Sequence, residues 1–347
     1  MRAAYSLALC LALTSATPIA RAAEDPAASE AGAALTWTIE GDAEQRAKGR
    51  VQLNLTRRTA TSRWSHGDIR PIAELQGITF EQLASEPGGP VGFRLGREAG
   101  TIECRGVARR YHGTGDCRFL ANADFAAALA RQGYGQASER QLFSLAFYGI
   151  GQAWLDELRR QGYERPDVAA LAKAADHGVD LDYLKGMGGH GYRVGSLSAL
   201  VEMRDHGVTP DYVSKLARLG IRDLSSEEVV RLRDHGVTPD YVAAFRTQGY
   251  ANVPTEQLIR LRDHGVSAEF VAELRASGYR SLSTDEIIRL RDHGVSGSYV
   301  AELAGLGYSS LTAEEITRLR IHGVSADSIR KANAGGTRRS AAELVAL

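Results

Sequence analysis

Two different spacings of apolar residues divide this 347-residue chain. Up to about residue 120, apolar residues alternate with polar ones, which is the period of half-buried β-strands. Glycines separate the alternating runs as they do in turns, and residues 71–84 suit a loop or a short helical turn. The pattern predicts a small antiparallel β domain over residues 36–120. The alternating positions are Trp37 and Ile39; Val51, Leu53 and Leu55; Val91, Phe93 and Leu95; Ile102 and Cys104; and Cys117 and Phe119.

After residue 120 the apolar spacing becomes helical, and the whole pattern recurs every 29 residues. Two short motifs recur with this 29-residue spacing. A Gly-Tyr pair, once Gly-Ile, has its glycine at positions 133, 162, 191, 220, 249, 278 and 307. A His-Gly pair has as its histidine His177, His206, His235, His264, His293 and His322.

Each unit reads as two helices. The first helix begins with a capping box such as Ser225 and Glu228, and the glycine of the His-Gly pair ends it. The second begins at residues such as Thr238, with Pro239 at the first helical position. Helices of about eleven residues are too short to be stable alone, so each unit must pack on its neighbours. The sequence predicts seven two-helix units from residue 138, with half units at both ends of an array over residues 121–347.

The predicted fold class is therefore α+β and multi-domain, with a small antiparallel β domain followed by an α-solenoid of 29-residue two-helix repeats. On the first helices an acidic residue precedes an arginine by four positions, as in Glu227 and Arg231 or Glu256 and Arg260. This spacing suits solvent-facing ion pairs within one helix.

The repeat resembles one found in bacterial envelope proteins: Leu-Arg-(Asp/Ile)-His-Gly-Val-(Ser/Thr)-x-x-Tyr-Val, then Gly-Tyr and Leu-Ser. It also looks like the extracytoplasmic tails of some membrane metallopeptidases of the β-lactam-sensor type. The resemblance covers about residues 121–347, and the segment from Phe93 to Thr101, with Gly106, Gly113 and Gly115, resembles the β module that often precedes such arrays. Those peptidases carry transmembrane helices and a His-Glu-x-x-His zinc motif. This sequence has neither, so the resemblance implies a repeat fold in the envelope without peptidase activity.

The first 22 residues have the features of a secretory signal. Met1 and Arg2 precede an apolar run, and Ala20-Arg21-Ala22 suits a cleavage site. We expect cleavage after Ala22, a flexible leader over residues 23–35, and a secreted or, in a Gram-negative cell, periplasmic protein. A lipoprotein with Cys10 at its anchor is disfavoured because Leu9, rather than a small residue, precedes it. No later apolar run approaches the roughly 20 residues that span a bilayer.

Cys104 and Cys117 remain after the signal is removed, with twelve residues between them. In an oxidising compartment a disulfide is the natural expectation. A redox-active pair would instead use Cys-x-x-Cys spacing, which this pair lacks.

The repeated histidines raise the alternative of a metal site. Equivalent residues in neighbouring repeats lie about 8–10 Å apart, whereas the ligands of one zinc ion lie within about 4 Å of each other. Each histidine stands at the end of a helix, where an imidazole can pack on the next unit and contact exposed carbonyls. The six histidines are therefore predicted to be structural, and no metal or cofactor is predicted.

Two local features carry open alternatives. Arg109 and Arg110, beside Tyr111 and His112, could form an anion site at a hairpin tip, but a solvated turn is favoured. The helix predicted over residues 181–190 contains Gly186, Gly188 and Gly189, each costly inside a helix by about 1 kcal/mol. A hinge or binding notch and simple decay of the repeat both explain them.

The net charge of the mature chain and the repetition of its residues restrict the classes of function that we expect. Loss of the signal leaves two more acidic than basic residues and no basic block, so a nucleic-acid partner is not expected. A catalytic residue is needed once, not in every repeat, and no nucleophile elbow or phosphate loop is present. The sequence predicts a non-enzymatic scaffold that binds a protein or peptide of the cell envelope. The alternatives are a hydrolase of unrecognised type and a purely structural spacer.

Overall fold

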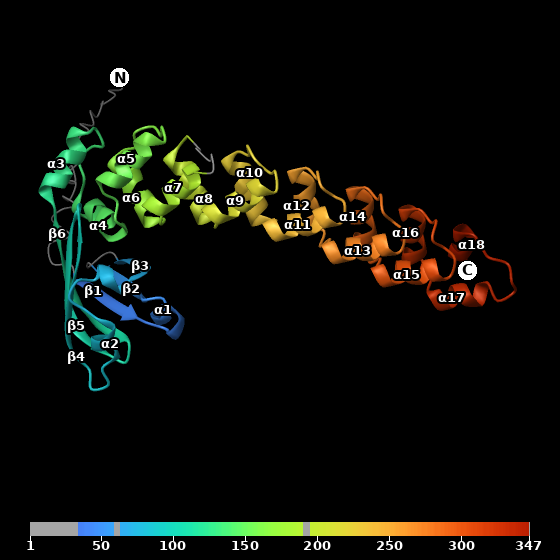
Figure 1. Cartoon of the computed structure of the whole chain (residues 1–347), viewed down its shortest axis with the longest axis horizontal. Coiled ribbons are helices and arrows are strands. Elements are labelled where there is room, and N and C mark those ends of the chain that lie inside the picture. The colour runs from blue at the N-terminus through green and yellow to red at the C-terminus, as the bar shows by residue number, and fades with distance from the viewer. Residues whose placement is uncertain (1–33, 59–62, 190–194, 347) are drawn as a thin grey trace, which may run out of the picture. The chain divides into compact units, whose positions relative to one another are not determined.

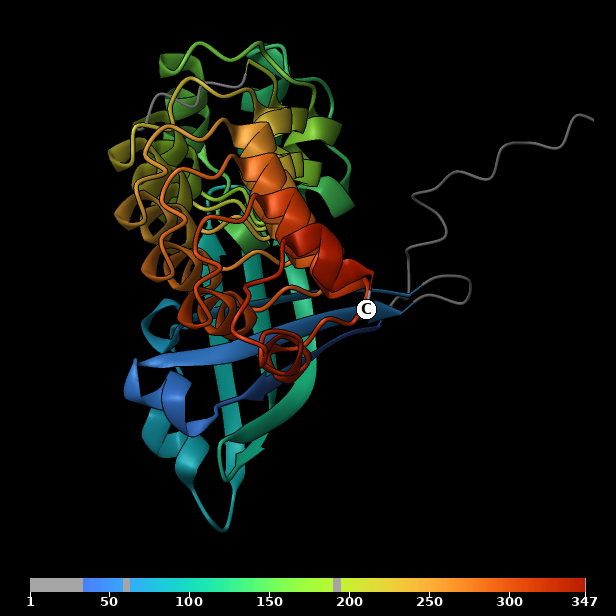
Figure 2. The same ribbon diagram turned by 90° about the vertical axis from the view of Figure 1, so that its right-hand side faces the viewer.

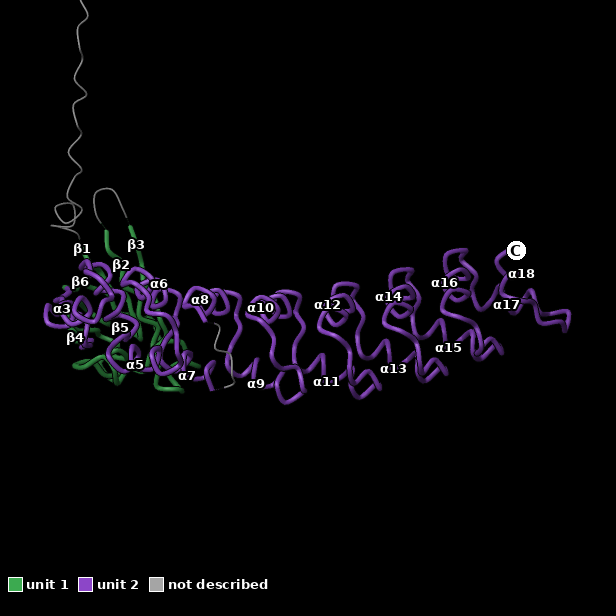
Figure 3. The backbone as a smooth tube through the Cα atoms, turned by 90° about the horizontal axis from the view of Figure 1, so that it is seen from above, with its two compact units in different colours: residues 1–94, 103–118 green, residues 95–102, 119–347 purple. Residues whose placement is uncertain are grey.

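The computed structural model describes residues 34–58, 63–189 and 195–346. The expected signal segment and most of the leader lie outside these residues. The contacts divide the chain into two compact units. One contains the described residues up to Arg94 and Glu103–Arg118, and the other contains Leu95–Ile102 and the chain from Phe119 onward (Figure 3).

A six-stranded antiparallel sheet confirms the predicted β region (Figure 1). The strand order is β3-β2-β1-β6-β5-β4. Strand β1 begins two residues before the expected boundary at residue 36. The strands are β1 (Ala34–Glu40), β2 (Arg50–Arg58), β3 (Arg63–Pro71), β4 (Gly89–Arg97), β5 (Gly100–Arg109) and β6 (His112–Ala121).

Apolar side chains alternate to one side of β1, β2, β4 and β5, as the period-2 pattern requires, and form a core with Trp37, Leu53 and Leu83. Two short helices, α1 (Ala43–Ala47) and α2 (Phe80–Ala84), and the 3-10 turn η1 (Ile72–Glu74) lie between strands. The α2 segment falls inside residues 71–84, where a loop or helical turn was expected.

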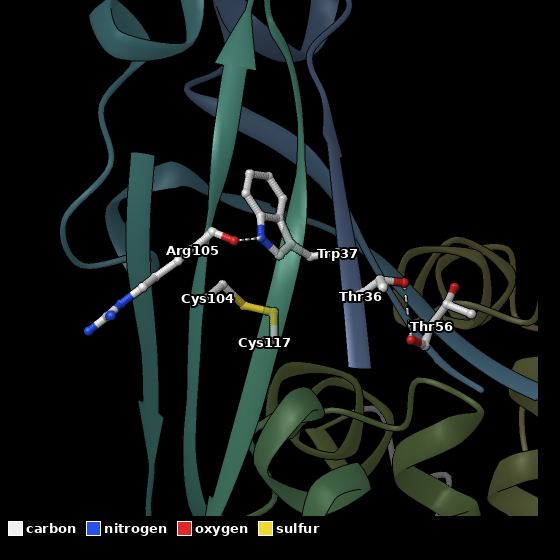
Figure 4. The surroundings of a disulfide bond; sticks show 6 residues. All are labelled: Thr36, Trp37, Thr56, Cys104, Arg105 and Cys117. Atoms are coloured by element: carbon white, nitrogen blue, oxygen red, sulfur yellow. Dashed lines mark hydrogen bonds between the residues drawn. A yellow bond between two sulfur atoms is a disulfide. The ribbon is translucent and has the colours of Figure 1, made fainter. Parts of the chain in front are cut away.

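The predicted disulfide joins Cys104 on β5 to Cys117 on β6, which are neighbouring strands. Figure 4 shows the Trp37 indole beside it, where its Nε1 donates to the Arg105 carbonyl at 3.1 Å. Trp37 is 1% exposed. The disulfide and this hydrogen bond together join β1, β5 and β6 within the sheet.

The helices of the second unit alternate as the 29-residue period predicts, and in the described part of the chain they form the seven expected two-helix units, preceded by α3 and followed by α18. First helices pack on first helices and second helices on second helices of the next repeat. Figures 2 and 3 show the two resulting rows. The first helices are α4 (Glu139–Tyr148), α6 (Val168–Asp176), α8 (Leu197–Asp205), α10 (Ser226–Asp234), α12 (Thr255–Asp263), α14 (Thr284–Asp292), α16 (Ala313–Ile321) and α18 (Ala341–Val345). The second helices are α3 (Ala123–Arg131), α5 (Gln152–Arg160), α7 (Leu181–Gly189), α9 (Pro210–Arg218), α11 (Pro239–Thr247), α13 (Ala268–Ala276), α15 (Gly297–Gly305) and α17 (Ala326–Ala332).

Caps define these helices locally. The predicted capping box at Ser225 and Glu228 is present, and the Thr238 side chain accepts from the Tyr241 amide to begin α11. Helix α5 lacks such a side chain, because its N-cap is a glycine. Both carboxylate oxygens of Glu98, from the β4–β5 turn, accept from the Gln152 amide at 3.2 Å instead. Glu98 thereby joins the β4–β5 turn to the first residue of α5.

Candidate functional site

The exposed surface of the array carries a regular row of imidazole–carboxylate pairs. In each pair the histidine that follows a first helix meets the aspartate that ends the first helix of the next repeat. The Nδ1 to Oδ1 distances are 2.7–2.8 Å, and the side chains are 37–44% exposed. We call these four pairs the His–Asp ladder: His177 with Asp205, His206 with Asp234, His235 with Asp263, and His264 with Asp292.

The ladder gives the histidines a partner that sequence reasoning did not assign to them. We expected the imidazoles to pack on the next unit and to contact carbonyls, but four of them contact carboxylates. The hydrogen bond to the Asp234 carboxylate raises the pKa of His206 above its ordinary value, because the carboxylate stabilises the protonated ring.

The ladder stops toward the C-terminus for a reason that is visible in the sequence. The residue equivalent to the aspartates is Ile321 in the repeat that follows His293, and its side chain is 59% exposed. Within the described residues, no three or more His, Cys, Asp or Glu side chains form a group that could hold a metal ion.

A second contact, from an arginine to a backbone carbonyl, also joins neighbouring repeats. The arginine two positions before the histidine donates from Nε to the carbonyl of the glycine that ends the previous repeat's first helix, at 2.9–3.1 Å. This glycine follows the C-cap histidine, so its carbonyl lies just outside the hydrogen-bonded helix. The donors are Arg204, Arg233, Arg291 and Arg320, and the acceptors are Gly178, Gly207, Gly265 and Gly294.

The guanidinium groups of the same arginines lie over aromatic rings of the preceding second helix. Arg320 Cζ, for example, lies 5.4 Å from the centroid of the Tyr299 ring. The ring hydroxyl then donates to the carbonyl of the valine after the next His-Gly pair, so that Tyr299 bonds Val324 at 2.7 Å. Burial raises the pKa of Tyr299, which keeps this hydroxyl protonated as a donor. Tyr183, Tyr212 and Tyr241 make the equivalent bond.

Two ion pairs join charged residues of neighbouring first helices. Arg231 Nη2 lies 2.8 Å from Glu256 Oε2, and Arg260 Nη1 lies 2.7 Å from Asp285 Oδ1. The expected pairing of Glu256 with Arg260 inside one helix is therefore not the contact seen. The first helices stack side by side, so a long guanidinium reaches the next helix as readily as its own.

The glycine-rich helix α7 packs closely on its neighbours at two of its three glycines. The buried Gln161 side chain donates to the Leu184 carbonyl at 2.8 Å, and a Cβ at Gly188 would overlap its carboxamide. A Cβ at Gly186 would lie 2.7 Å from the Pro210 ring. Nothing lies within 4 Å of the Cβ position of Gly189. A hinge at these glycines remains a prediction, and residues 190–194 lie outside the described chain.

The arginines of the β5–β6 turn contact a neighbouring loop. Arg110 Nε lies 2.6 Å from a carboxylate oxygen of Glu86, and Arg109 Nε donates to the Glu86 carbonyl at 2.8 Å. At the tip of the β5–β6 hairpin, the guanidinium of Arg110 is therefore already paired with the Glu86 carboxylate. Arg109 and His112 also line an open depression of about 610 Å³ on the sheet.

Among the described residues, no helix is both long and apolar enough to cross a membrane. No protein-family model matches the chain, and no curated protein is significantly similar to it.

Proposed function

We propose that this protein is a non-enzymatic binding scaffold of the cell envelope, secreted or periplasmic, whose array holds a protein or a peptide. The proposal depends chiefly on one observation: the exposed surface of the array repeats the same polar pairs in successive units. In repeat proteins such surfaces lengthen with each unit and serve as extended binding faces.

The charge of this surface bears on the kind of partner. Each rung of the ladder joins a carboxylate to an imidazole, and the neighbouring pairs join carboxylates to guanidinium groups. These pairs place charges of both signs side by side, whereas a nucleic acid or an anionic membrane would require a large field of positive charge. This face suits a polar protein or peptide partner.

The disulfide supports the proposed location, because structural disulfides persist in oxidising compartments. The secretory signal expected over residues 1–22 points to the same compartment.

Crosslinking in the intact envelope, followed by mass spectrometry of the captured proteins, tests the proposal. A shortened chain lacking Ser225–Leu282 loses two whole repeats and joins Leu224 to Ser283, another capping serine. In this chain Asp292 takes the place of Asp234 opposite His206, so the contacts between repeats are kept. A scaffold is expected to lose its partners or hold them weakly.

A full-length variant with altered surface charge separates the scaffold from the spacer. The triple substitution Arg231→Gln, Glu256→Gln and Arg260→Gln changes the charges on the exposed surface of the array without changing the number of repeats. Loss of partners in this variant supports binding by the array, whereas unchanged partners would indicate a spacer. Turnover of peptides or glycans by purified protein, abolished by one substitution, would instead indicate a hydrolase.

A further inference from the structure

The solvent-facing side of the sheet carries the open depression that Arg109 and His112 line. Its volume of about 610 Å³ lies in the range of small-molecule sites, about 300–1,000 Å³. Three adjacent strands, β1, β6 and β5, and the start of β4 form it. All of its lining residues belong to the sheet unit.

A row of charged and polar side chains crosses the three strands in this depression. Glu40 is paired with His112 in the β1–β6 register, and both are exposed. Arg110 and Tyr111 form a two-residue turn with φ angles of 50° and 66°, so Arg109 and His112 face each other across the β5–β6 hairpin. The row therefore has a carboxylate at one end, an imidazole in the middle and a guanidinium at the other end.

An apolar surface lies beside this row. Thr38 is paired with Thr114, and Val107 lies two residues from Arg109 on β5, so these three form the next row. Val107 is 58% exposed, which makes it one of the few large apolar side chains on the described surface. Gly88, which precedes β4, and Gly89, the first residue of β4, also line the depression and have no side chain to cover this surface.

The length of the charged row limits the length of a ligand that can contact both of its ends. Neighbouring strands lie about 4.8 Å apart, so the row spans about 10 Å from β1 to β5. Three extended residues also span about 10 Å. Arg109 is held by its Nε bond to the Glu86 carbonyl, and its terminal nitrogens carry the paired N–H donors that suit a carboxylate.

We infer that the depression binds a short free peptide of about three residues. Its terminal ammonium contacts Glu40, its terminal carboxylate contacts Arg109, and an apolar side chain lies over Val107. This site is separate from the binding face proposed for the array and does not depend on it.

Titration of the full mature chain with Ala-Leu-Ala, by calorimetry or by NMR, tests the inference. The same peptide is used with both ends free, with an acetylated N-terminus, with an amidated C-terminus, and with both ends blocked. Each block removes one charge-assisted contact and is expected to weaken binding about tenfold.

Substitutions assign each end of the peptide. Glu40→Gln is expected to abolish the preference for a free N-terminus, and Arg109→Gln the preference for a free carboxylate. Asp116→Asn and Arg105→Gln are matched controls, because both residues are exposed on this side of the sheet and neither lines the depression. The controls should bind as the unsubstituted chain does.

Absence of binding by the free peptide at millimolar concentration would overturn the inference without any variant. Binding that is equally strong with both ends blocked would also overturn it, because the site would then not recognise the peptide ends. Neither result would affect the proposal for the array, which is tested by crosslinking.

Discussion

The buried tyrosine hydroxyls between repeats make a quantitative prediction. Tyr299 is 6% exposed and donates to the Val324 carbonyl at 2.7 Å, whereas the equivalent residue of the preceding repeat is Phe270. Both rings lie beneath an arginine at similar distances, 5.4 Å for Tyr299 and 5.6 Å for Phe270. Exchanging tyrosine and phenylalanine at these two positions therefore changes the hydroxyl and little else.

Tyr299→Phe leaves a buried carbonyl without this donor, which costs about 1–2 kcal/mol. Phe270→Tyr should add a bond to the Val295 carbonyl, which occupies the place of Val324, and stabilise the array by about 1 kcal/mol. For 150–250 residues, each kcal/mol changes Tm by about 2–4 °C. We expect a fall of about 2–8 °C for the first change and a rise of about 2–4 °C for the second.

Thermal unfolding followed by circular dichroism at 222 nm measures both changes, because helix signal reports mainly on the array. The double variant should lie near the sum of the two single changes, since the altered bonds lie in different repeat junctions. A fall in Tm for Phe270→Tyr comparable to that for Tyr299→Phe would refute the reasoning, because the hydroxyl would then not determine stability at this position.

Two further predictions concern the ladder and helix α7. Because the folded pKa of His206 is raised, the stability from its pair with Asp234 is fully present below the unfolded pKa of about 6.5 and is lost as pH rises through the folded value. Asp234→Asn should therefore lower Tm more at pH 6 than at pH 8.5, and an equal effect at both would contradict the assignment. Gly188→Ala should destabilise by about 1–3 kcal/mol through overlap with Gln161, whereas Gly189→Ala should be neutral or stabilising by up to about 1 kcal/mol. Equal unfolding midpoints in urea for these two variants would show that close packing does not explain Gly188.

Signals that act within a few residues of sequence were sufficient to predict the array. The capping box of Ser225 and Glu228 and the N-cap at Thr238 are present where the sequence placed them. Such contacts join residues one turn apart, so their geometry is already contained in the spacing of the residues. The disulfide was also predictable, because Cys104 and Cys117 are the two cysteines left after the expected signal is removed and a secreted chain is in an oxidising compartment.

Strand β3 was missed because its buried side is polar. His66 is 7% and Arg70 is 3% exposed, so the strand lacks the alternation of apolar residues that marked the others. Its existence depends on pairing with β2, in which Leu55 faces His66 and Val51 faces Arg70. That register joins residues on different strands and leaves no periodic signal in β3 itself.

The partners of the exposed charged residues were decided by the tertiary structure alone. Asp234 precedes His235 in sequence, but its carboxylate contacts His206 of the previous repeat, and Arg231 contacts Glu256 of the next. The sequence by itself determined the two periods, the caps, the length of each unit and the cysteine pair, because these depend on neighbouring residues or on a short loop. Contacts over 25 to 28 positions depend on how one repeat stacks on the next, and that stacking becomes defined only when the buried helix faces pack together.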